Sequence, residues 1–122
     1  MRCWTKMTLV VAAAILPLSA QAMTVDQFLA KANALKAKGM MAMFSSDIGL
    51  LKAEMGDAIK AWVADKAARK AAGKPPLACA PEGSKMNSDD LLKWLAALPP
   101  DQRAGSVREG FARVVINRYP CR

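Results

Sequence analysis

The side chains that could do chemistry in this chain are three cysteines, a cluster of methionines and a run of basic residues. Histidine is absent, which excludes Ser-His and Cys-His nucleophile pairs and imidazole metal ligands. The ten acidic residues are scattered, no Gly-rich phosphate loop occurs, and neither Cys79 nor Cys121 belongs to a C-x-x-C pair. We therefore expect neither catalysis nor a bound cofactor, and a binding function is the class that remains.

Cys79 and Cys121 are predicted to form a disulfide. If the chain is exported, Cys3 leaves with the leader and these two thiols have no other partner within the protomer. Their bond would close a loop of roughly 40 residues and stabilise the fold by about 3–4 kcal/mol in the chain-entropy model. That is a large share of the ~5–15 kcal/mol that stabilises a typical domain.

Residues 1–22 have the pattern of a secretory signal peptide. Arg2 and Lys6 form a short positive region, an apolar run follows over residues 7–18, and small residues precede the predicted cleavage after Ala22. The apolar run is too short for a transmembrane anchor, which needs about 20 residues. We expect a periplasmic protein whose mature part, residues 23–122, is a single domain.

The predicted mature chain is basic. Loss of Arg2 and Lys6 lowers the number of basic residues from 18 to 16 against ten acids, so the net charge falls from +8 to about +6. In a cytosolic protein this balance would suggest nucleic acid, but export favours an anionic surface or an acidic protein instead. A solvated basic surface that only aids solubility is an equally good interpretation.

Two helices are predicted before residue 74. Thr24 and Gln27 form a capping box at the start of the first, which ends near Gly39. The second runs from about Ile48 to Ala72. The apolar positions expected to face inward are Val25, Phe28, Leu29, Ala32 and Leu35 in the first helix, and Ile48, Leu51, Met55, Ile59, Trp62 and Val63 in the second.

The segment between these helices contains Met40, Met41 and Met43. Three thioethers could form a soft site for Cu(I), which is one hypothesis for an exported protein. Methionine also fills irregular apolar gaps in cores and interfaces, which is the interpretation we favour.

The second helix ends in a run of basic residues. Lys66, Arg69, Lys70 and Lys74 could form a basic surface that contacts anionic lipid or cell-wall polymer. The alternative is a solvated helix end, whose cations suit the negative end of the helix dipole. The first option gives a second function hypothesis, an envelope structural or stress protein that binds anionic material through this helix.

Two shorter helices are predicted in the C-terminal half. Asn87 or Ser88 caps the first, which ends at Leu98, and residues 101–103 make a turn. Ser106 and Glu109 form a second capping box. The expected inward positions are Leu91, Trp94, Leu95 and Leu98, then Val107, Phe111, Val114 and Val115.

No segment alternates with the period of a strand, so the predicted fold class is all-α. We expect a small bundle of about four helices held by one disulfide. Residues 23–73 supply two helices, and residues 74–122 form a disulfide-closed unit of two more.

The stretch from Cys79 to Cys121 also carries a family resemblance. Its order is Cys79-x-Pro81-x-Gly83, a helix, Pro100-x-x-Arg103, then a capped helix ending in Tyr119-Pro120-Cys121. This outline resembles the immunity proteins of type VI secretion amidase effectors, the Tai-type family. The resemblance implies an exported helical inhibitor that binds a peptidoglycan amidase effector and blocks its catalytic cleft, often as a homodimer. It also implies structural roles for Pro81, Gly83, Pro100, Arg103 and Pro120. Residues 23–78 lack the second cysteine pair of that family, so no inhibitory residue is carried over.

Overall fold

The computed structural model describes residues 22–122, so the predicted signal peptide lies outside the described part apart from Ala22. The elements are α1 (Val25–Lys38), the 3-10 helix η2 (Gly39–Phe44), α2 (Ser46–Ala71), α3 (Ser88–Ala96), α4 (Pro100–Arg103) and α5 (Val107–Arg118). Within these residues the only β-type pairing is an isolated bridge between Thr24 and Ser106. The predicted all-α bundle with one disulfide is confirmed.

The expected turn at residues 101–103 is instead the short helix α4. Pro100 occupies its first position, where the fixed φ of proline suits a helix and its missing amide would have no intrahelical partner anyway. Pro100 therefore starts a helical turn, whereas the sequence suggested only that the Pro99–Pro100 pair ends the preceding helix.

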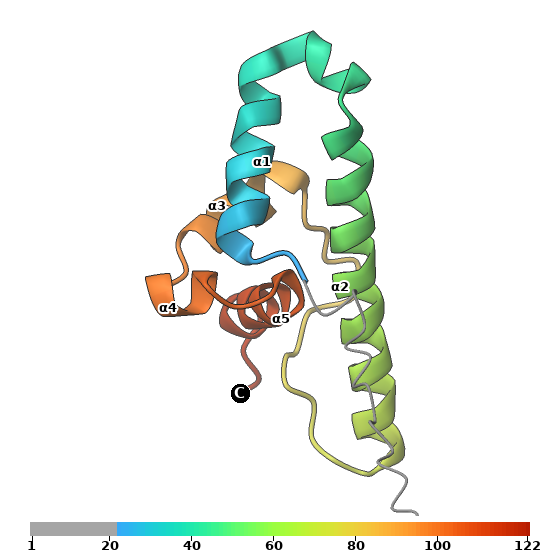
Figure 1. The fold of residues 1–122 in the computed structure, drawn as a ribbon. Coiled ribbons are helices and arrows are strands. Elements are labelled where there is room, and N and C mark those ends of the chain that lie inside the picture. The colour runs from blue at the N-terminus through green and yellow to red at the C-terminus, as the bar shows by residue number, and fades with distance from the viewer. Residues whose placement is uncertain (1–21) are drawn as a thin grey trace, which may run out of the picture.

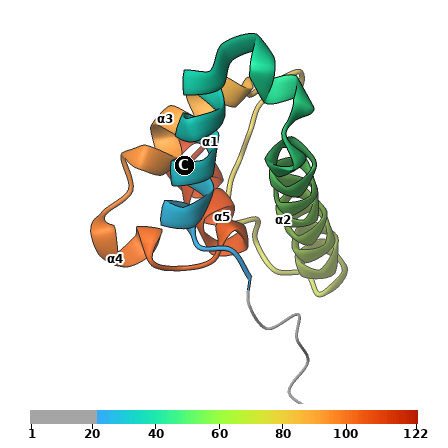
Figure 2. The same cartoon turned by 45° about the horizontal axis from the view of Figure 1, so that its top comes forward.

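α1 and α2 form a long hairpin that is joined at one end by η2 (Figure 1). α3 and α4 lie on the side of α1 that faces away from α2, and α5 lies near the N-terminal end of α1, where it packs against both α1 and α2. In Figure 2, α2 lies at the outside of the molecule, on one side of the other helices. The segment between Gly73 and Asn87 connects the C-terminal end of α2 to α3.

The core lies mainly between α1, α3 and α5. Val25, Leu95 and Val107 are the largest side chains that are fully buried. All five inward positions predicted for α1, and all four predicted for α5, are buried. Leu95 of α3 and Leu98, two residues after its end, are buried, while Leu91 and Trp94 of α3 pack against the core from its edge.

The prediction for α2 was wrong at Ile59 and Val63, and Ile48 is half-buried but does not pack against the core. Ile59 and Val63 are 45% and 58% exposed, and Ala58, which was not predicted, is 1% exposed. Leu51, Met55, Ala58 and Trp62 recur at spacings of four, three and four, and these side chains meet the core. Since neighbouring residues are about 100° apart around a helix, Ile59 and Val63 are turned out of that line.

The N-termini of α1 and α5 lie side by side. The Val25 amide donates to the Gly105 carbonyl, and the Val107 amide donates to the Met23 carbonyl, each at 3.0 Å. Both bonds of the Thr24–Gln27 capping box form. Of the predicted Ser106–Glu109 box only one bond forms, in which the Ser106 hydroxyl accepts from the Glu109 amide at 3.2 Å. Met23, the first predicted mature residue, is itself buried in the core.

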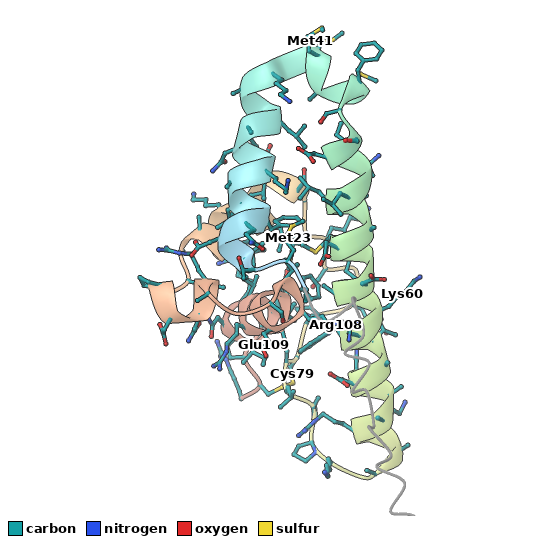
Figure 3. The ribbon with its side chains drawn as sticks, viewed as in Figure 1. Met23, Met41, Lys60, Cys79, Arg108 and Glu109 are labelled. Carbon is teal, nitrogen blue, oxygen red and sulfur yellow. A yellow bond between two sulfur atoms is a disulfide. The ribbon has the colours of Figure 1, made fainter. Side chains whose placement is uncertain are left out.

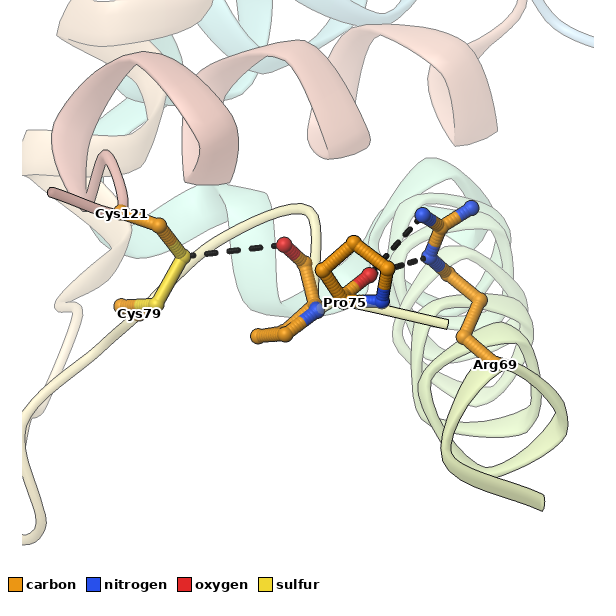
Figure 4. Close-up of a disulfide and its surroundings, with 5 residues drawn as sticks. Arg69, Pro75, Cys79 and Cys121 are labelled. Atoms are coloured by element: carbon orange, nitrogen blue, oxygen red, sulfur yellow. Dashed lines mark hydrogen bonds between the residues drawn. A yellow bond between two sulfur atoms is a disulfide. The ribbon is translucent and has the colours of Figure 1, made fainter. Parts of the chain in front are cut away.

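The disulfide joins the segment after α2 to the chain end after α5. The Cα atoms of Cys79 and Cys121 are 4.9 Å apart, and the Cys79 amide donates to the Tyr119 carbonyl at 2.8 Å. The Sγ atom of Cys121 lies 3.7 Å from the Pro76 carbonyl oxygen (Figure 4). An oxidised sulfur has no hydrogen to donate, so this last approach is a packing contact.

The residues of the family outline lie at joints of the fold. Pro81 begins a tight turn closed by the Ser84 amide at 3.1 Å, and Gly83 has the positive φ of 78° that this turn needs. Arg103 donates through Nη1 to the Ala96 and Leu98 carbonyls, both at 3.1 Å, and its Nε is 3.2 Å from an Asp26 carboxylate oxygen. Pro120 is exposed beside Cys121.

Candidate interaction surfaces

The most exposed apolar side chains of residues 22–122 are on η2, at the closed end of the α1–α2 hairpin. Met40, Met41, Met43 and Phe44 are between 67% and 85% exposed. Figure 3 shows Met41 at the very end of the hairpin, far from the disulfide. We call these four residues the hairpin tip.

The geometry of a 3-10 helix explains why so many apolar side chains of η2 face solvent. With three residues per turn, every third residue lies on the same side. Gly39 and Ala42 share one row, and Ala42 is buried against the body of the protein. The other two rows, Met40 with Met43 and Met41 with Phe44, therefore both face outward.

Two exposed ion pairs join α1 to α2 and α3 below the tip. Lys31 of α1 is 3.5 Å from Asp47 of α2, and Lys36 of α1 is 3.0 Å from Asp89 of α3. The Ser45 hydroxyl caps α2 by accepting from the Asp47 amide at 3.3 Å. Exposed ion pairs contribute only about 0–1 kcal/mol each, so these two add little to the stability of the fold.

The hypothesis of a Cu(I) site places three thioethers on this tip. Met41 lies about a third of a turn away from the row shared by Met40 and Met43. Two of the three thioethers thus lie on one side, and the third points elsewhere. No group of three or more His, Cys, Asp or Glu residues that could hold a metal occurs between residues 22 and 122.

The second exposed surface follows the length of α2. Lys52, Ile59, Val63, Lys66 and Lys70 recur at spacings of seven, four, three and four, so they share one side of the helix. Lys74 follows four residues later, just past the helix end. We call these six residues the lysine face. Lys52 and the apolar pair were not predicted as part of a surface, although their helical spacing could have indicated it.

Of the four basic residues predicted near the end of α2, three belong to this face. Arg69 does not, because its Nε and Nη2 atoms donate to the Pro75 carbonyl at 3.0 and 2.9 Å (Figure 4). Its guanidinium thereby ties the chain after α2 to the helix. A hollow at this end is lined by Lys66, Arg69, Lys70, Gly73, Lys74 and Pro76, a set without any acid.

Two further hollows border α5. One is lined by Val115 of α5, by residues between Pro76 and Ala80, and by four residues of α2, namely Trp62, Asp65, Lys66 and Arg69. The other lies where the Arg118 guanidinium sits 4.8 Å from the centre of the Trp94 ring. The charged residues of the first hollow all come from α2, and Arg118 is the one charged residue that lines the second.

No helix within residues 22–122 has both the length and the apolar character needed to cross a bilayer. The chain matches no family model, no curated protein and no solved structure, so its function has to be argued from these two surfaces and from the outline of residues 79–121.

Proposed function

We propose that this chain is an exported protein-binding module of the immunity type, which inhibits a peptidoglycan amidase effector in the periplasm. The observation that carries the proposal is the hairpin tip, where four large apolar side chains are held out in solvent. Exposed apolar groups of this kind mark interaction sites when they are contiguous.

The composition of the tip suits a protein partner. Methionine and aromatic residues are enriched in protein interfaces, and unbranched methionine side chains adapt to the shape of a partner. No charged residue occurs between Gly39 and Phe44. A narrow, uncharged projection of this type is complementary to an enzyme cleft, because such clefts are concave and mostly apolar.

Burial of the tip would supply substantial binding energy. Full burial of a Met or Phe side chain contributes about 1.5–3 kcal/mol by transfer alone. The four side chains are already displayed by the fold, which lowers the entropic cost of association. A few such residues dominate the energetics of a typical interface.

The resemblance of residues 79–121 to the Tai-type family supplies the class of partner. In this proposal the disulfide-closed half acts as the scaffold, since Arg103 and Gly83 lie at its structural joints. The hairpin of α1, η2 and α2 makes the contact. The family's residues do not extend into that hairpin, so the target's identity depends on the tip and its surroundings.

The test is to measure binding and inhibition with peptidoglycan amidase effectors of type VI secretion systems. The full chain is expressed for export, purified in the oxidised form, and titrated into the effector while peptide release from peptidoglycan is followed. We expect Phe44→Asp and Met41→Asp to weaken inhibition by about 100-fold or more, as expected for interface hot spots.

The matched control is Val63→Asp, which places the same charge at an exposed apolar position away from the tip. It should inhibit as well as the unmodified protein. Absence of binding to the effector, or equal loss in the tip and control variants, would contradict the proposal.

A further inference from the structure

We propose that the lysine face of α2 binds the surface of a bilayer that contains anionic phospholipid. This inference goes beyond the proposed function, because it concerns a different surface and a different ligand. It would let the molecule lie on a membrane while its hairpin tip stays available to a protein.

The charges of α2 are separated around the helix. Asp47, Glu54, Asp57 and Asp65 recur at spacings of seven, three and eight, which places them together on one side. The lysine face is turned about 150° from that side, by the same helical arithmetic. It therefore contains no acid along the whole of α2.

The acidic and basic sides of α2 also differ in the ion pairs that they form. Asp47 pairs with Lys31 of α1, and Asp65 shares a hollow with Arg108 of α5. The ion pairs found between residues 22 and 122 do not involve Lys52, Lys66, Lys70 or Lys74. One acid of α2 is thus paired with another helix, whereas the lysines of the face are exposed and take part in none of these ion pairs.

The shape of this face suits a flat ligand. Lys52 and Lys70 are 18 residues apart on one continuous helix, which is a row of about 27 Å. Ile59 and Val63, both exposed, lie in the middle of the row. On a bilayer these two side chains would enter the headgroup region, while the lysine stems lie along it with their ammonium groups at the phosphates.

Lysine composition favours lipid over an acidic protein. Lysine is depleted at protein interfaces, where arginine forms the bidentate pairs with carboxylates. The arginine at this end of α2, Arg69, is held by the Pro75 carbonyl and does not join the face. Lysines work as separate point charges, which is sufficient for a surface of mobile phosphate groups.

The experiment is co-sedimentation of the oxidised full chain with vesicles. Phosphatidylglycerol mixed with phosphatidylethanolamine is the anionic probe, and phosphatidylcholine is the neutral reference. We expect binding to the anionic vesicles only, and its loss as salt is raised, because surface charges are screened. The triple variant Lys52→Gln, Lys66→Gln, Lys70→Gln should bind roughly 10- to 100-fold more weakly.

A second triple variant controls for net charge. Lys38→Gln, Lys85→Gln, Lys93→Gln removes the same charge from exposed lysines outside the face, and it should bind like the unmodified protein. Circular dichroism should show that both triple variants are folded. Equal weakening by the two variants would overturn the proposal, since binding would then follow net charge alone.

Two further outcomes would also overturn it. One is absence of binding to the anionic vesicles, or stronger binding to soluble polyglutamate than to vesicles, which would indicate an acidic polymer as the partner. The other is loss of vesicle binding in Phe44→Asp with full binding in the first triple variant, which would move the contact to the hairpin tip. The amidase assay on the same proteins is independent of these results, so failure of either proposal can be recognised separately.

Discussion

The two helices of the hairpin, α1 and α2, differ sharply in how they use their length. α1 has 14 residues and buries five of them, whereas α2 has 26 residues and only Ala58 is fully buried. α1 contacts α2, α3, α4 and α5, while α2 packs against α1 and α5 and has these neighbours on one side only. A long helix is therefore not the centre of this fold, and its free sides are open to other molecules.

This difference in burial follows from which side chains share the inward face of each helix. In α1 the apolar residues fall in one stripe that meets α3 and α5. In α2 the inward line includes the small Ala58, and the large Ile59 and Val63 fall outside it. Stability should thus be concentrated in α1, α3 and α5, and binding should be concentrated on α2 and η2.

The largest expected difference in the free energy of unfolding is between an alanine substitution in the core and one on the surface of α2. Leu95→Ala should lower the free energy of unfolding by about 2–5 kcal/mol, because Leu95 is completely buried and its loss leaves a cavity. Ile59→Ala should change it by no more than about 0.5 kcal/mol, as expected for an exposed position. Urea titration of both variants measures this. Similar losses in the two would show that α2 belongs to the core.

Removal of the disulfide should have the next largest effect. Cys79→Ser with Cys121→Ser should cost about 3–4 kcal/mol in the free energy of unfolding, since the bridge closes a loop across a sequence separation of 42 residues. Thermal unfolding of the oxidised and reduced unmodified protein provides the matched comparison. A cost below about 1 kcal/mol would mean that the unfolded chain is compact without the bridge.

Replacement of a glycine by alanine should lower the free energy of unfolding in α5 and raise it in α2. A methyl group on Gly110 would overlap the Val25 side chain, so Gly110→Ala should destabilise the protein by about 1–3 kcal/mol. No atom lies within 4 Å of the corresponding position at Gly56, so Gly56→Ala should stabilise it by up to about 1 kcal/mol. Denaturant midpoints of the two variants, with equal slopes, test the contrast. A destabilising Gly56→Ala would reveal a close contact on α2 that this fold does not contain.

Helix caps should show the smallest difference. Thr24→Ala removes one bond of a complete capping box and should cost about 1 kcal/mol. Ser45→Ala removes a single longer bond, 3.3 Å to the Asp47 amide, and should cost less. Calorimetry can resolve the two melting temperatures. The reverse order would place more of the protein's stability at the start of α2 than its burial indicates.

Much of the fold was predictable because local signals were strong. The capping box at Thr24, the Ser106 cap of α5 and the apolar periodicity of α1 and α5 follow from neighbouring residues. The disulfide was predicted because Cys3 was assigned to the leader, which leaves Cys79 and Cys121 as a pair. The helix α4 was missed because a proline pair suggests a stop in isolation, and only its position between α3 and α5 makes Pro100 a helix start.

The candidate surfaces were predictable only in part. The methionine segment and the basic end of α2 were recognisable by composition, but their exposure was not. Arg69 belongs to the basic run by sequence, and yet its partner is the Pro75 carbonyl. Ile59 and Val63 fit an apolar stripe as well as Ala58 does, and the line that meets the core excludes them.

The sequence by itself determined α1, α2, α3 and α5 and their N-terminal caps, because these depend on residues close in the chain. The sulfur pairing was predicted by assigning Cys3 to the leader. The tertiary structure decided which side of α2 is covered, where the tip points, and that Gly110 must stay small against Val25. The periodicity of a sequence shows which side chains share a face of a helix. Which of these faces is buried depends on the surface of the neighbouring helices, so only the packing between helices decides it.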